Sequence, residues 1–121
     1  MLKNAIYMEE NRRKQRRKER QAIYNTKQWH NIRNLVIREH PLCVDCLKEN
    51  KITPAEEVHH IISFMKFDKS DPRRIEYAYK KDNLVPLCKK CHIYRHHPEL
   101  KALDKYTDYS DEDDNETNDI C

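Results

Sequence analysis

The 121-residue chain contains no glycine, although an average protein has about 7%. This absence excludes the glycine-rich loops with which many nucleotide-binding enzymes hold phosphate groups. Any phosphate that the protein binds must therefore be held by side chains.

Long hydrophobic runs are also missing. No apolar stretch approaches the roughly 18 residues needed to cross a membrane, and residues 1–20 contain no secretory hydrophobic segment. Only 37% of the residues are hydrophobic, which together with the short length excludes a broad buried sheet such as that of a Rossmann or barrel fold. We therefore expect one small, soluble, intracellular domain with appendages and no membrane association.

Charge is strongly segregated along the chain. Residues 1–20 and residues 21–103 each carry a net charge of +5, whereas residues 104–121 carry −7. This distribution suits a protein that approaches a polyanion, although both ends can equally be solvated appendages. The candidate DNA-binding side chains in the basic arm, residues 1–23, are Arg12, Arg13, Lys14, Arg16 and Arg17. The arm contains no helix breakers and can be helical, but like charges repel at helical spacing, so we expect it to become ordered on a partner that neutralises them.

Residues 101–121 form an acidic tail with too little apolar surface to offset the entropy of ordering it, and we predict that it is disordered. The ordered region lies between the arm and the tail. There, Thr26 is a candidate N-cap, and apolar residues from Trp29 onward follow helical spacing until His40 and Pro41. This pattern predicts an amphipathic helix whose tryptophan is a core anchor rather than a base-stacking residue.

Two Cys-x-x-Cys pairs, Cys43 with Cys46 and Cys88 with Cys91, are separated by 41 residues. In a chain without a secretion signal, two such pairs are typical of a tetrahedral structural Zn²⁺ site. The alternative is a redox role, but a thioredoxin-type pair needs a βαβ context that is missing here. Zinc would also stabilise a domain with a thin core. The remaining Cys121 is expected to be an unligated thiol.

Five of the seven histidines lie in two clusters beside the cysteine pairs. His59 and His60 interrupt a short apolar strand pattern, and adjacent residues of a strand point to opposite faces. One of them can therefore ligate a metal while the other faces a substrate. His92 and His96 share one face of a predicted helix. These two imidazoles and a third from the strand form a candidate divalent-metal site with open positions.

The runs CVDC, EEVHHII and DNLVPLCKKCH, taken together, resemble the HNH endonucleases. The stretch YNTKQWHNIRNLVIREHPLCVDC is similar to a subgroup of small phage and bacterial members in which a helix with a tryptophan precedes the first cysteine pair. The likeness covers about residues 24–97. It implies an α+β fold, a small zinc-stapled ββα-metal (His-Me finger) domain preceded by an amphipathic helix, which we place at residues 24–100.

The resemblance also implies roles for individual residues. His60 falls at the general base that activates water, and Asn83 at the residue whose side-chain hydrogen bonds hold the loop and the base in place. His59 and His92 fall at ligands of a catalytic divalent ion, and His96 fits a third ligand found in members with an H-x3-H ending. Since His59 stands where aspartate is commoner, the ion can be Mg²⁺, Mn²⁺, Ni²⁺ or Zn²⁺, and imidazole favours the transition metals.

The segment from residue 63 to 81 mixes basic and aromatic side chains, which fits contact with a phosphate backbone but also an ordinary solvated loop. Its candidate DNA contacts are Arg73 and Arg74, and a short helix is expected to start near Asp71 and Pro72.

We therefore predict a metal-dependent endonuclease that hydrolyses DNA phosphodiester bonds, by nicking or double-strand cleavage, in the cytoplasm of a bacterial host cell. Resemblance to phage members further suggests a role in DNA packaging with terminase proteins as partners. A catalytically inactive zinc-ribbon module that only binds nucleic acid is the main alternative, and a zinc-stabilised protein-interaction domain is another. The joint presence of His60, Asn83 and His92 argues against a pure binder, which needs none of them.

Overall fold

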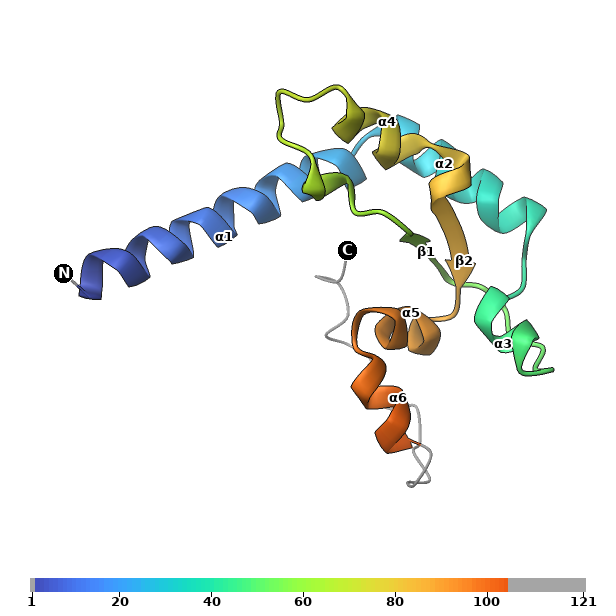
Figure 1. Cartoon of the computed structure of the whole chain (residues 1–121). Helices are drawn as coiled ribbons and strands as arrows, with labels where there is room; N and C mark the ends of the chain where they lie inside the picture. The colour runs from blue at the N-terminus through green and yellow to red at the C-terminus, as the bar shows by residue number, and fades with distance from the viewer. Residues whose placement is uncertain (1, 105–121) are drawn as a thin grey trace.

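The computed structural model describes residues 2–104, which form helices around a two-stranded antiparallel sheet (Figure 1). The elements in chain order are α1 (Leu2–Tyr24), α2 (Lys27–Glu39), α3 (Val44–Lys48), β1 (Glu57–His60), the 3-10 helix η1 (Phe64–Lys66), α4 (Arg73–Tyr79), the 3-10 helix η2 (Lys81–Asn83), β2 (Leu84–Leu87), α5 (Lys89–His96) and α6 (Pro98–Asp104). This arrangement confirms the predicted α+β class. Among the described residues, no helix has both the length and the apolarity to cross a membrane.

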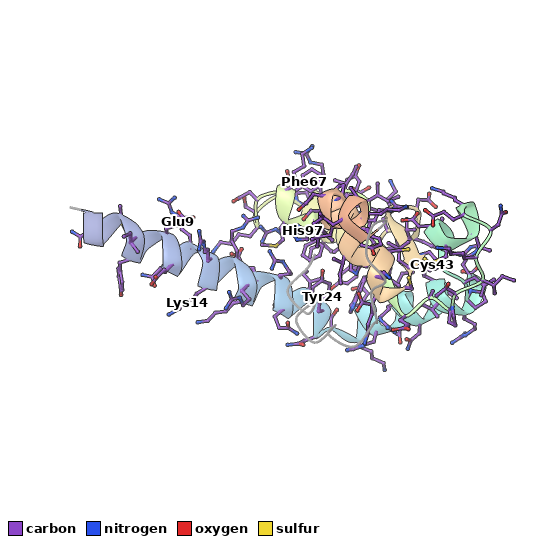
Figure 2. The ribbon with its side chains drawn as sticks, turned by 90° about the horizontal axis from the view of Figure 1, so that it is seen from below. Glu9, Lys14, Tyr24, Cys43, Phe67 and His97 are labelled. Carbon is purple, nitrogen blue, oxygen red and sulfur yellow. The ribbon has the colours of Figure 1, made fainter. Side chains whose placement is uncertain are left out.

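Helix α1 runs through the whole basic arm, and its N-terminal half projects away from the rest of the molecule (Figures 1 and 2). We expected charge repulsion to oppose this helix, but Glu9 pairs with Arg12 and Arg13 one turn further on, which offsets part of the repulsion. The C-terminal half is anchored to the body because Ile23 packs against Phe64 and other core residues.

Helix α2 forms where the sequence predicted it. The Thr26 side chain accepts a hydrogen bond from the backbone N–H of Trp29 at 3.1 Å, and the helix ends at His40, just before Pro41. Trp29 and Val36 are buried together with Val58 of β1 and Leu84 of β2. The tryptophan is therefore a core anchor, as expected, and it fastens α2 to one face of the sheet.

Strands β1 and β2 pair in a register that sets Glu57 opposite Leu87 and His60 opposite Leu84. Because side chains alternate along a strand, His59 and His60 point to opposite faces. His60 faces the side covered by α2, and His59 faces α5. The expectation that the two adjacent imidazoles face different surroundings is therefore confirmed.

A second core cluster lies where α1, η1 and α4 meet; it consists of Ile23, Phe64, Met65 and Ala78. A third cluster contains Leu87 and three of the cysteines. We call the two Cys-x-x-Cys turns the knuckles, and part of the core is thus built from knuckle residues. None of these clusters is large. Each sulfur pair begins a short helix, because Cys43 is the N-cap of α3 and Cys88 is the N-cap of α5.

Helix α6 continues to Asp104, four residues into the segment predicted to be a disordered tail. It is tied to the end of α3 by an ion pair of 2.6 Å between the Lys101 Nζ and a carboxylate oxygen of Glu49. Local pattern did not predict this helix, and its two leucines, Leu100 and Leu103, are exposed rather than part of a core. The remainder of the predicted tail, including Cys121, lies outside the described residues.

Candidate metal centres and catalytic pocket

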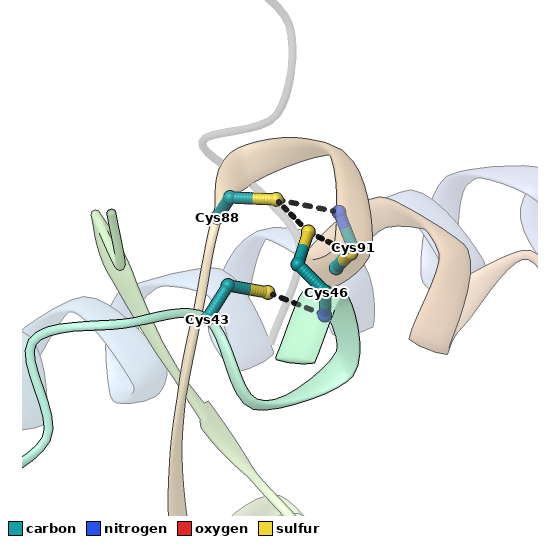
Figure 3. A group of neighbouring side chains, drawn as sticks. All are labelled: Cys43, Cys46, Cys88 and Cys91. Atoms are coloured by element: carbon teal, nitrogen blue, oxygen red, sulfur yellow. Dashed lines mark hydrogen bonds between the residues drawn. The ribbon is translucent and has the colours of Figure 1, made fainter. Parts of the chain in front are cut away.

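The two cysteine pairs meet at one point (Figure 3). Cys43 and Cys46 come from the turn that begins α3, and Cys88 and Cys91 come from the turn that begins α5. The four Sγ atoms all lie within 4.8 Å of one another. Two turns that each begin a helix, distant in sequence, thus present a compact tetrad of sulfurs.

The spacing of these sulfurs fits a tetrahedral metal ion. Four sulfurs each about 2.3 Å from a central zinc would lie about 3.8 Å apart, whereas a disulfide would bring two to about 2.0 Å. The Cys46 Sγ lies 3.9 Å from that of Cys88 and 3.6 Å from that of Cys91. Burial raises the pKa of Cys88 to about 11 and raises that of Cys91 further. A bound cation reverses this tendency, because a coordinating thiol is deprotonated.

Three imidazoles form a second candidate metal centre. His59 of β1 and His92 and His96 of α5 each place a ring nitrogen within 4.8 Å of the other two. We call these three residues the histidine triad. Burial, together with the neighbouring His92, lowers the pKa of His59 to about 3 and that of His96 to about 4. Both imidazoles are therefore neutral near pH 7, which is the form that ligates metals.

The sequence reading missed a carboxylate that supports the triad. The Nδ1 of His92 lies 2.7 Å from a carboxylate oxygen of Glu57. Metal-ligating histidines usually donate their second ring N–H to such a group, which fixes the tautomer and leaves the other nitrogen for the metal. Glu57 stands two residues before His59 in β1, so strand alternation alone places both on the same face, and this signal could have identified it.

His60 occupies the other face of the sheet and is 3% exposed. Its ring stacks on Trp29, with centroids 5.1 Å apart, and its Nε2 lies 3.0 Å from the carbonyl oxygen of Ala78. A carbonyl can only accept, so Nε2 carries the proton and Nδ1 holds the lone pair. The buried Nδ1 has no hydrogen-bond partner among the described residues. Burial lowers the pKa of His60 to about 4, although the Ala78 carbonyl acts in the opposite direction.

One pocket joins His60 to the histidine triad. It has a volume of about 250 Å³ and is partly open to solvent. Its lining residues are His59, His60, Ile61, Ser63, Phe64, Arg95 and His96. The two adjacent histidines leave β1 on opposite faces, yet both reach this pocket because the strand ends at His60 and the chain turns there. A base with a free lone pair and a candidate metal centre therefore border the same space.

Asn83 closes the long segment that joins the two strands. Its amide nitrogen donates to the carbonyl oxygens of Ile62 and Tyr77, both at 2.9 Å, and its Oδ1 accepts from the backbone N–H of Ile62 at 2.8 Å. The side chain is buried. It thus fixes the turn that follows His60 against the end of α4.

The predicted DNA-contact residues fall into two groups. Most are exposed along α1; they are Arg12, Arg13, Lys14, Arg16 and Arg17. Arg73 is also exposed, paired with Asp71 and lying over the ring of Phe67. Arg74 is buried instead, and it donates to Glu19 of α1 and to the carbonyl oxygen of Phe67, both at 2.8 Å. Its guanidinium group therefore ties α1 to the body.

Comparison with known proteins identifies related sequences and structures. A family model described as HNH endonuclease matches residues 43–97, which include both knuckles and all of the pocket histidines. The crystal structure of the HNH endonuclease of the deep-sea thermophilic bacteriophage GVE2, with manganese ion, is 30% identical and has a TM-score of 0.53. The alignment covers 81% of this chain and 97% of that one. No curated protein sequence matches this chain.

Proposed function

Because the chain belongs to the HNH endonuclease family, we propose that it hydrolyses phosphodiester bonds of DNA with the help of a divalent metal ion. The observation that carries this proposal is the shared pocket, which His60 lines together with His59 and His96 of the histidine triad. A binding module without catalysis would gain nothing from a buried imidazole nitrogen left without a partner, since such a group costs stability.

His60 is proposed as the general base. Its Nε2–H donates to Ala78, which fixes the tautomer and leaves the lone pair on the Nδ1 of a ring that lines the pocket. There Nδ1 accepts a proton from the water that attacks the phosphorus. The low pKa keeps the free imidazole neutral at pH 7, and the negative charge of a bound phosphate raises that pKa toward the value that base catalysis needs.

The histidine triad is proposed to hold the catalytic ion. A divalent ion bound there would stabilise the negative charge that develops on the leaving oxygen. His59, His92 and His96 supply neutral nitrogen donors, and Glu57 orients His92. A three-imidazole donor set favours Mn²⁺, Ni²⁺ or Zn²⁺ over Mg²⁺, and the phage relative was solved with manganese.

Two further groups position this machinery. Asn83 is proposed to keep the turn after β1 in place, so that His60 and the pocket wall hold their geometry. The four cysteines are proposed to bind one structural Zn²⁺, which fixes the start of α5 and thereby the helix that carries His92 and His96.

The DNA backbone is proposed to lie along the exposed basic side chains of α1 and beside Arg73, where lysine and arginine contact phosphates. One candidate catalytic pocket among the described residues favours nicking by a monomer, so a double-strand break needs two chains or two successive nicks. The phage origin of the relative supports a role in phage DNA processing within the bacterial host. Packaging (terminase) proteins are proposed as partners from the sequence resemblance to phage members alone.

Incubation of the purified full chain with supercoiled plasmid tests this function. Parallel reactions contain EDTA or Mg²⁺, Mn²⁺, Ni²⁺ or Zn²⁺. We expect relaxed or linear DNA with at least one transition metal and intact plasmid with EDTA. His60→Ala, which leaves the metal ligands and α1 unchanged, is the control against contaminating nucleases. Plasmid binding without cleavage under all conditions would instead support the inactive binding module.

A further inference from the structure

Arg95 is the one basic residue that lines the pocket besides the histidines. It lies on α5 three residues after His92, so these two side chains share a side of the helix, and it directly precedes His96. The other lining side chains are histidines, Ile61, Ser63 and Phe64, so Arg95 carries the only permanent charge in the pocket lining.

The first knuckle holds Arg95 in place. Its Nε donates to one carboxylate oxygen of Asp45 and its Nη2 donates to the other, both at 2.7 Å. Asp45 stands between Cys43 and Cys46, and it does not line the pocket. The pair therefore has its carboxylate on the knuckle side and its guanidinium on the pocket side.

This geometry leaves donors available. A guanidinium has five N–H groups, and the fork to Asp45 uses one on Nε and one on Nη2. The remaining N–H groups, including both on Nη1, can bind an anion in the pocket. A forked arginine is preorganised, so little side-chain entropy is lost when it binds. Paired arginines that merely join two helices need not border a cavity, whereas this one does.

We propose that Arg95 is a catalytic residue that binds the scissile phosphate in the pocket that His60 also lines, and that Asp45 is the positioning residue that orients it. This inference rests on the proposed function, since it names a further contact to the same substrate. The contact strengthens as charge accumulates on the phosphoryl oxygens during attack, which lowers the barrier more than it tightens substrate binding.

Steady-state cleavage by the zinc-loaded full chain and its Arg95 variants provides the kinetic test. We expect Arg95→Ala to lower kcat about 100-fold and to change KM less than about threefold, as for the loss of a transition-state donor. Arg95→Lys keeps the positive charge but loses the two-pronged hydrogen bonding of the guanidinium. Its kcat should therefore lie between that of the parent and that of Arg95→Ala. Lys89→Ala removes an exposed charge from the same helix and should leave both constants unchanged.

A double-variant cycle tests the role of Asp45. Asp45→Asn should lower kcat about tenfold in the parent and cause no further loss in the Arg95→Ala background, because the two residues act as one unit. Zinc content is measured for every variant. Full zinc content with reduced kcat supports the proposal, and parent kcat in Arg95→Ala overturns it. Additive losses in the double variant overturn the positioning role of Asp45.

NMR separates this inference from the activity itself. The Arg95 Nε–H resonance of the zinc-loaded chain is assigned as the signal that is missing from the spectrum of Arg95→Lys. It should shift when a short DNA duplex is added without a catalytic ion. An unchanged resonance at saturating DNA overturns the proposal even if Arg95→Ala does not fold. Absence of plasmid cleavage by the parent contradicts the proposed function, whereas the Arg95 resonance reports phosphate binding independently of cleavage.

Discussion

At the scale of single residues, the imidazoles of the pocket divide into two classes by their surroundings. His60 lies among Trp29, Phe64 and Ala78, on the face of the sheet that α2 covers. The rings of His59, His92 and His96 lie 5.0–5.2 Å apart, centroid to centroid. These two environments predict two different responses to substitution.

His60→Ala should lower the cleavage rate by about two to four orders of magnitude, as expected for loss of a general base, and added metal should not restore it. His92→Ala should weaken binding of the catalytic ion, so that higher metal concentrations partly restore activity. Plasmid cleavage over a metal titration measures both effects. Rescue of His60→Ala but not of His92→Ala by metal would contradict the assigned roles.

Glu57→Gln should weaken the catalytic ion site about 10- to 100-fold, because the amide orients His92 less firmly and does not raise its basicity. The metal concentration for half-maximal cleavage measures this change. Glu56→Gln is the matched control, since Glu56 is the adjacent carboxylate and only a distant partner, at 4.0 Å, of Lys89. If both variants change the metal concentration for half-maximal cleavage equally, Glu57 does not act by orienting His92.

Motif spacing identified the candidate ligands, but it could not reveal contacts between distant residues. Glu57 meets His92 across 35 positions, and Arg95 meets Asp45 across 50. Arg74 was grouped with the surface arginines because its sequence neighbourhood is basic, whereas packing of α1 places Glu19 beside it. Such partners depend on how the helices pack, which local patterns do not encode.

At the scale of elements, α2 and the two strands were predictable because local signals mark them. Thr26 and Pro41 delimit α2, and short apolar runs mark β1 and β2. The absence of helix breakers allowed α1, but the charge pattern indicated repulsion, and the anchoring contacts of Arg16 and Glu19 are tertiary and have no local signal.

The projecting half of α1 should contribute to DNA binding through its charge. Replacing Arg12, Arg13 and Lys14 with glutamine should reduce the slope of log affinity against log salt by about 2.7 if each contacts one phosphate. The anchoring residues Arg16, Glu19 and Ile23 remain. Fluorescence anisotropy with a labelled duplex over a salt series measures the slope.

The matched control replaces Lys27, Lys51 and Lys89 with glutamine, which removes the same charge from other exposed positions. It should leave the slope nearly unchanged. If the α1 variant and the parent have the same slope of log affinity against log salt, the arm does not contact phosphates and is a solvated appendage.

At the scale of the whole molecule, stability is distributed over three small clusters, one of which contains the knuckle cysteines. A core of this size is marginal without an additional crosslink. The predicted zinc tetrad follows from sequence alone because four cysteines in two close pairs have few other uses in such a chain. That α5 connects this cysteine tetrad to the pocket histidines could be seen only in the folded structure.

Removal of zinc should unfold the domain. We expect one zinc per chain by elemental analysis, and loss of the cooperative thermal transition in the Cys43→Ser/Cys88→Ser double variant or after treatment with a strong chelator. Circular dichroism monitors the loss of helix and its return when zinc is restored to the parent. A double variant that melts like the parent, or a purified chain without zinc, would rule out the structural site.

The two halves of the cysteine tetrad are made at different times. The 41 residues between Cys46 and Cys88 take about 2 to 8 s to synthesise at roughly 5 to 20 residues per second. During this interval the nascent chain contains the first cysteine pair, while the two cysteines of the second pair have not yet been synthesised. β1 is likewise complete before β2, its partner in the sheet of the described residues, exists. The nuclease domain therefore cannot mature stepwise from its N-terminus, and its completion awaits translation of the last quarter of the chain.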